Sequence, residues 1–141
     1  MAARVHPIQL ADIRVDRATS FRRKRVKSDP LTHIAHIPRP RLLDVAADRR
    51  SFRIVVSTRV RVPLAEDDIW VGVVRMVATL VSDEDVPDDL AVAFARLSGV
   101  FLVWPYARLY VDQLGKMAGV AVPPLPLLSR PGSVTAPERR P

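Results

Sequence analysis

The stretch FRIVVSTRVRVPLAEDDIWVGVVRMVATLV, residues 52–81, decides the fold of this chain. In its first half apolar and polar residues alternate, as they do in a β-strand with one buried and one wet face. The apolar positions are Phe52, Ile54, Val56, Val60 and Val62, and the polar ones are Arg53, Ser57, Arg59 and Arg61. Residues 63–68 supply a turn, and residues 69–81 are rich in β-branched side chains and apolar on both faces. The two halves together predict a β-hairpin.

Upstream of this hairpin the sequence predicts one further strand and a long irregular stretch. Apolar residues alternate with polar or small ones over roughly 8–20, with a one-residue slip near Ala11 that suggests a β-bulge. Residues 21–41 combine a basic cluster with Asp29-Pro30 and with two further prolines, Pro38 and Pro40. Because proline fixes φ and removes an amide donor, we expect a long crossing loop there. A short apolar run, 42–45, then leads into the hairpin.

Downstream of the hairpin the pattern becomes helical. An acidic stretch, 82–89, ends in Asp88 and Asp89, either of which can cap a helix over residues 90–97. Ser98-Gly99 interrupts the helical spacing, and a second helix is expected over about residues 100–117, with Pro105 near its beginning. After Gly119 the segment VAVPPLPLL is expected to lie extended on the body of the protein.

The second predicted helix is apolar nearly all round, whereas a surface helix shows a single apolar stripe. A domain of this size has too little chain to surround such a helix, so we infer an oligomer with the helix inside the interface. The expected interface residues are Phe101, Trp104, Tyr106, Tyr110 and Leu114. We expect one domain over residues 1–128 and a disordered tail over residues 129–141, which are rich in Pro, Arg, Ser and Gly.

The net charge of +7 is unevenly distributed. Residues 1–61 carry 15 Lys and Arg against 5 Asp and Glu, whereas residues 62–128 carry 4 against 9. The densest basic cluster, Arg22, Arg23, Lys24, Arg25 and Lys27, could contact phosphates or an acidic protein surface. A solvated loop is the simpler interpretation, because no recognition helix or interleaved aromatic accompanies the cluster. A nucleic-acid-binding protein working through residues 14–61 therefore stands as an alternative function.

The sequence offers little for chemistry. It contains no cysteine, no glycine-rich phosphate loop and no nucleophile-elbow motif. His33 and His36 stand three apart, but flanking prolines argue against a helix and no nearby carboxylate completes a metal site. We expect no enzyme, no cofactor and no metal. The longest apolar run, residues 100–104, is too short to cross a bilayer and the N-terminus lacks a signal-like pattern, so a cytoplasmic protein is expected.

Residues 101–128, FLVWPYARLYVDQLGKMAGVAVPPLPLL, resemble the SecB export chaperones. The family's main helix carries an aromatic-Pro-Tyr-Ala-Arg core, matched by Trp104, Pro105, Tyr106, Ala107 and Arg108, and a Gly and a Pro-rich apolar segment follow it. The order of elements agrees from Ile8 onward, so the resemblance spans about residues 8–128. It implies an α+β fold, a four-stranded antiparallel sheet with two helices packed on one face, assembled as a homotetramer (a dimer of dimers).

The resemblance also implies a function, that of an ATP-independent holdase that binds unfolded polypeptide in hydrophobic grooves. The client would be a preprotein for export or the antitoxin of a toxin-antitoxin system. The groove candidates, each of which could equally be plain core, are Ile13, Val15, Leu42, Leu43, Val45, Trp70, Leu125 and Leu127. Binding of the SecA motor is in doubt, because the strand expected over residues 69–81 has no acidic residue. A scaffold oligomer without clients is a further alternative.

Overall fold

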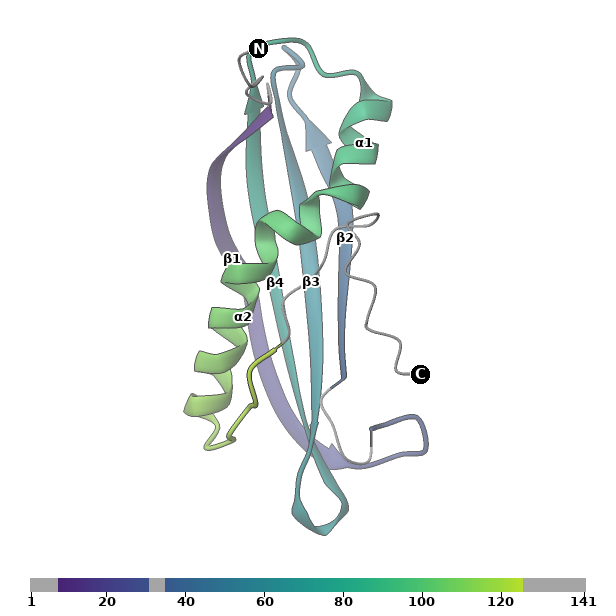
Figure 1. Cartoon of the computed structure of the whole chain (residues 1–141), viewed down its shortest axis with the longest axis vertical. Helices are drawn as coiled ribbons and strands as arrows, with labels where there is room; N and C mark the ends of the chain where they lie inside the picture. The colour runs from purple at the N-terminus through teal and green to yellow at the C-terminus, as the bar shows by residue number, and fades with distance from the viewer. Residues whose placement is uncertain (1–7, 31–34, 126–141) are drawn as a thin grey trace, which may run out of the picture.

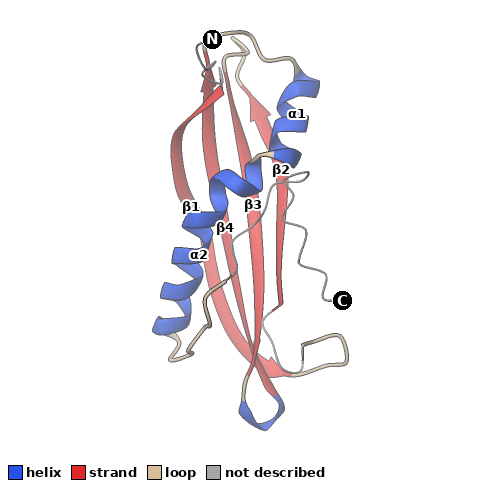
Figure 2. Cartoon of the chain, viewed as in Figure 1, coloured by secondary structure: helices blue, strands red, loops and turns tan. Residues whose placement is uncertain are grey.

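The computed structural model describes residues 8–30 and 35–125, with the backbone only at 35–37. Its elements are β1 (Ile8–Lys24), β2 (Ala35–Val45), β3 (Ser51–Pro63), a 3-10 turn (Ala65–Asp67), β4 (Asp68–Ser82), α1 (Asp88–Leu97) and α2 (Gly99–Met117). Within these residues four strands form one antiparallel sheet in the order β1-β4-β3-β2. Both helices lie across the same face of that sheet (Figures 1 and 2). This confirms the predicted α+β fold and the predicted hairpin.

The first strand is longer than the sequence predicts, because β1 continues to Lys24 and not to about residue 20. The expected slip near Ala11 is confirmed as a register shift between Leu10 and Asp12, and a second shift lies between Val15 and Arg17. Each extra residue locally disrupts the ladder and lets the strand bend. The long β1 therefore curves along the whole length of β4, as Figure 1 shows.

The prediction of a crossing loop over residues 21–41 is wrong, because most of that range is strand. Pro38 and Pro40 lie inside β2, which pairs with β3 alone and so forms an edge of the sheet. Residues two apart in a strand direct their amide positions to the same side. Both missing donors can therefore face away from β3, where a proline removes no ladder hydrogen bond.

The core lies between the sheet and the two helices. The expected inward residues of β3 are buried there with Trp70, Met76 and Leu80 of β4 and Val103 and Ala107 of α2. Gly72 makes room for the Trp70 ring, whose Cη2 would lie 2.5 Å from a Cβ at that position. On α1 the Phe94 ring packs edge-to-face on Phe52, with centroids 5.7 Å apart. Burial of this apolar stripe holds both helices on the sheet.

The other face of the sheet is free of helices, yet one end of it is covered. The Asp29 carboxylate accepts hydrogen bonds from Arg23 at 2.5 and 2.9 Å, from Arg61 at 3.1 Å and from the Val26 amide at 2.9 Å. In the sheet register Arg23 neighbours Ile69 and Arg61 neighbours Val71, both of which are fully buried. The turn after β1 is thus pinned back over the end of the sheet. Its hydrogen bonds, that from Arg23 first, hold the pKa of Asp29 far below its usual range.

Among the described residues no single helix is long and apolar enough to cross a membrane. Only α1 and α2 together, with a bend of 44° between them, reach that length and apolar character.

Candidate functional site

The end of α2 is shaped so that the chain turns back along the helix. Gly119 has a φ of 71°, the left-handed conformation that glycine adopts without strain. The Val120 amide donates to the Gly115 carbonyl at 2.8 Å, and the Gly119 amide donates to the Lys116 carbonyl at 3.1 Å. These two bonds form a Schellman motif, which ends the helix and satisfies carbonyls that would otherwise have no partner. The following residues therefore run back beside α2.

Gly115 lets the returning segment approach the helix closely. A Cβ placed there would lie 2.3 Å from Cγ2 of Val122 and 3.1 Å from the Val120 carbonyl oxygen. Any larger residue would have to displace that segment. Val120 and Leu125 are buried against the core on either side of Val122. Residues 120–125 are thus anchored and form a fixed second wall beside α2.

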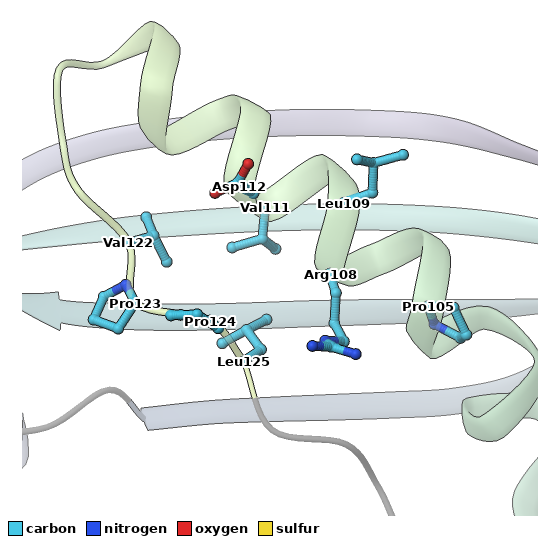
Figure 3. Close-up of a pocket in the computed structure, with 9 residues that line it drawn as sticks. All are labelled: Pro105, Arg108, Leu109, Val111, Asp112, Val122, Pro123, Pro124 and Leu125. Atoms are coloured by element: carbon cyan, nitrogen blue, oxygen red, sulfur yellow. The ribbon is translucent and has the colours of Figure 1, made fainter.

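A hollow of about 290 Å³ lies between these two walls (Figure 3). The α2 wall contributes Pro105, Arg108, Leu109, Val111 and Asp112, and the returning segment contributes Val122, Pro123, Pro124 and Leu125. Figure 3 shows Val111 and Arg108 directed from the helix toward the segment. Most of the lining is apolar, and Arg108 and Asp112 add one cation and one anion. We call this hollow the α2 groove; its chemistry suits apolar side chains, with few polar contacts.

A second hollow, of about 540 Å³, lies between the end of β2 and α1. It is lined by Leu42, Val45, Ala46, Ala47, Arg49, Asp88 and Val92. An adjoining apolar hollow of about 460 Å³ shares Val92 and lies along α1 between Asp89 and Leu97. We call these two the α1 hollows. They are open to solvent on the helix side of the molecule, as the α2 groove is.

The structure brings together some of the predicted groove residues. Leu42 and Val45 line one of the α1 hollows, and Leu125 lines the α2 groove. Ile13 and Val15 are partly buried on β1, packed against the core on the helix side. Leu43 is half-buried at the register shift of β2. Trp70 is fully buried and lines neither hollow, and Leu127 lies outside the described residues.

Of the predicted interface residues, some are buried within their own chain and others are exposed on α2. Trp104 is only 3% exposed, because it packs into the core of its own chain. Phe101 and Leu114 are partly buried, whereas Tyr106 and Tyr110 are 41% and 36% exposed. Leu109 and Met117, which the prediction omitted, are also exposed on α2. The outward apolar surface of α2 is therefore made by Tyr106, Leu109, Tyr110 and Met117.

The basic cluster at the end of β1 is largely neutralised within the chain. Arg23 pairs with Asp29, Lys24 with Asp68 at 2.8 Å and Arg25 with Asp67 at 2.5 Å. The hydrogen bond that Lys24 donates to Asp68 raises the pKa of Lys24. Cations that already hold carboxylates are poorly placed to release counterions from a phosphate backbone. The structure thus gives the nucleic-acid alternative no support at this cluster.

The α2 side of the site was missed by the sequence prediction, which assigned the outer face of that helix to an interface. A signal for it was present. Gly115 and Gly119 are four apart at the end of an apolar helix and precede a proline-rich apolar segment, a pattern that permits a Schellman turn and a close return. Within the residues that the structure describes, no three His, Asp or Glu side chains gather where they could hold a metal ion.

No family model matches this sequence, and no curated protein matches it. Solved structures do match. A SecB-like chaperone of Mycobacterium tuberculosis, solved in complex with a ChAD peptide from the HigA1 antitoxin, aligns over 87% of this chain and 88% of its own, at 20% identity and a TM-score of 0.70. A Streptococcus agalactiae protein of unknown function aligns over 85% of this chain and 97% of its own, at 8% identity and a TM-score of 0.48. The chain therefore has a SecB-like fold, as the resemblance of residues 101–128 implied.

Proposed function

We propose that this protein is a SecB-like chaperone that binds unfolded segments of client polypeptide in the α2 groove and the α1 hollows, without nucleotide. The observation that carries the proposal is the match to the mycobacterial chaperone over nearly the whole of both chains, because that protein was solved with a peptide bound to it. The open apolar hollows on the helix side support the same function from this chain's own residues.

Binding would rest on burial of apolar side chains. The hydrophobic effect contributes about 25 cal/mol for each Å² removed from water and has no direction, so it holds many sequences with little discrimination. Pro123 and Pro124 have no amide hydrogen to offer a client. The wall that they form would therefore bind through side-chain contact, while Arg108 and Asp112 meet the polar backbone or charges of the client.

We infer that the client is an antitoxin and not an exported preprotein. The bound peptide of the mycobacterial chaperone comes from an antitoxin. On this chain, β4 carries no acidic side chain between Ile69 and Val81, so the carboxylates that the export family presents to SecA from its sheet are missing along this strand.

We also infer that the protein assembles through the outward surface of α2. Tyr106, Tyr110 and Met117 are exposed on α2 and line neither the α2 groove nor the α1 hollows. Exposed apolar residues gathered in this way are typical of interfaces. A homotetramer would bury them, and light scattering coupled to size-exclusion chromatography would give its mass. Tyr106→Glu combined with Tyr110→Glu should dissociate it; an unchanged mass would refute this interface.

Binding of a dye-labelled unfolded peptide, followed by fluorescence anisotropy, tests the proposed site. Leu109→Asp in the α2 groove and Val92→Asp in the α1 hollows should each weaken binding and leave the mass of the assembly unchanged. The control for Leu109→Asp is Leu90→Asp, a leucine of similar exposure on α1 that lies outside all three hollows. The control for Val92→Asp is Val81→Asp, a valine of similar exposure on the helix-free face. Equal affinity in site and control variants would exclude these hollows as the binding site.

A further inference from the structure

The helix-free face of the sheet carries a large excess of arginine. The register assigns residues to this face, because Cα partners in an antiparallel pair direct their side chains to the same side. Nine arginines, Arg14, Arg17, Arg23, Arg39, Arg41, Arg53, Arg59, Arg61 and Arg75, and four aspartates, Asp12, Asp16, Asp29 and Asp44, lie on or against it. The face thus has five more positive than negative charges.

Internal ion pairs use only part of this charge. Arg23 and Arg61 hold Asp29, as described above. Arg53 donates to Asp44, whose pKa is lowered by that hydrogen bond, and Arg75 pairs with Asp16 at 3.1 Å. Within the part of the chain that the structure describes, five arginines of this face have no acidic partner: Arg14 and Arg17 on β1, and, apart from them, Arg39, Arg41 and Arg59. The last three lie on the neighbouring strands β2 and β3.

Two of the three arginines share a hollow. Arg39, Ser57, Arg59 and Val73 line a depression of about 210 Å³ on this face. In the register Arg39 pairs with Ser57, and Arg59 pairs with Val73 across the β3–β4 ladder. Both guanidinium-bearing residues are exposed, while Ser57 and Val73 are half-buried and form the floor. Arg41 lies two residues beyond Arg39 on the same side of β2, which is about 7 Å along a strand.

We propose that Arg39, Arg41 and Arg59 form a docking site for an acidic segment of another polypeptide, with the Ser57 hydroxyl as a further donor. Guanidinium groups bind carboxylates through paired hydrogen bonds. Two carboxylates at alternate positions of an extended peptide stand about 7 Å apart, which matches the separation of Arg39 and Arg41. Val73 provides an apolar contact on the floor of the depression.

The arrangement favours an acidic peptide over nucleic acid. Asp44, held by Arg53, follows Arg41 on the same face of β2 and would repel a phosphate backbone that continued past it. A short cluster of three cations also offers few phosphate contacts, whereas nucleic-acid affinity grows with their number. A second copy of this chain is a less suitable occupant, because two of the five acidic side chains of its 82–89 stretch, Asp85 and Asp88, already pair with Arg50 and Arg49.

This site goes beyond the proposed client function, because it lies on the opposite face of the sheet from the α2 groove and the α1 hollows. Its test does not depend on chaperone activity. The probe is a dye-labelled peptide with glutamate at three alternate positions, compared by fluorescence anisotropy with the same peptide carrying glutamine. The variant is Arg39→Glu combined with Arg59→Glu. The matched control, Arg22→Glu combined with Arg96→Glu, changes two exposed arginines away from the helix-free face and leaves the same net charge.

We expect the glutamate peptide to bind more tightly than the glutamine peptide, with an affinity that falls as salt is added. Arg39→Glu with Arg59→Glu should weaken binding at least tenfold, while the control pair should change it less than twofold. Arg39→Gln with Arg59→Gln should weaken it by a smaller factor without introducing repulsion. Equal losses in variant and control, no preference for glutamate, or tighter binding of a single-stranded oligonucleotide of equal charge would each overturn the proposal.

Discussion

Replacing Gly115 by alanine tests whether the close return of residues 120–125 holds the α2 groove together. Gly115→Ala adds one methyl group at a helical position where that methyl would lie 2.3 Å from Cγ2 of Val122. The Val120 carbonyl oxygen, on the segment tied to Gly115 by the 2.8 Å hydrogen bond of the Schellman motif, would be 3.1 Å away. The new methyl group therefore meets a stiff β-branched side chain and a fixed backbone atom.

Two opposing terms set the size of the effect. Alanine is favoured over glycine inside a helix by about 1 kcal/mol. Inserting a methyl group into a packed site costs about 1–3 kcal/mol. At 2.3 Å the packing cost dominates, and we expect a net loss of about 1–2 kcal/mol in the free energy of unfolding. Val122→Ala removes the clashing Cγ2 and leaves Cβ at 3.4 Å, an ordinary contact. In that background Gly115→Ala should cost less than it does in the wild type, because only the 3.1 Å approach to the Val120 carbonyl oxygen remains tight.

Urea unfolding at one fixed protein concentration, followed by circular dichroism, measures the four members of this double-mutant cycle. We expect Gly115→Ala to weaken peptide binding as well, because the second wall of the groove must move. Gly99→Ala is a useful contrast, since its new methyl group meets only Cδ1 of Ile54, the end of a flexible side chain, at 2.8 Å. A Gly115→Ala protein as stable as wild type, with no coupling to Val122, would refute the reasoning.

Three further changes probe the core and the helix-free face. Asp29→Asn should destabilise the protein at neutral pH. Because the hydrogen bond from Arg23 lowers the pKa of Asp29, the stability that the carboxylate contributes is present above its unfolded pKa of about 4 and is lost as the pH falls toward its folded pKa. The urea midpoints of variant and wild type should therefore converge on acidification, and a constant difference would contradict this. Gly72→Ala should lower the free energy of unfolding by about 1–3 kcal/mol and shift the tryptophan fluorescence, because the rigid Trp70 ring lies 2.5 Å from the new methyl group. An unshifted spectrum would argue against that contact. Trp104→Ala should cost about 3–5 kcal/mol in urea unfolding if the side chain belongs to the core of its own chain, and a loss below about 1 kcal/mol would return it to the interface.

The hairpin and the two helices were predictable because their patterns are local. Alternation over β3 and helical spacing after Asp88 require no knowledge of the rest of the fold. The end of β1 was not predictable in this way, since residues 21–24 carry a basic run. Pairing with β4 and the ion pairs of Arg23 and Lys24 keep that run in the sheet. These partners, Asp29 and Asp68, are identified only by the tertiary structure.

β2 was missed for a related reason. Proline argues against a strand unless that strand lies at an edge with the prolines facing outward, and position in the sheet cannot be read from Pro38 and Pro40 themselves. Of the predicted groove residues, Leu42, Val45 and Leu125 line the hollows, and their contact with a client stays a prediction. Trp70 was predicted either to line the groove or to belong to the core, and the structure places it in the core, where Gly72 leaves room for its ring.

The central claim is that this protein holds unfolded polypeptide without nucleotide. It is tested most directly by light scattering of a chemically denatured model protein diluted from urea, with and without a stoichiometric amount of the purified protein and with no ATP. We predict that the wild-type protein suppresses the rise in scattering and that Leu109→Asp combined with Val92→Asp suppresses it less. Aggregation that proceeds unchanged at a several-fold excess of the wild-type protein would contradict the holdase function.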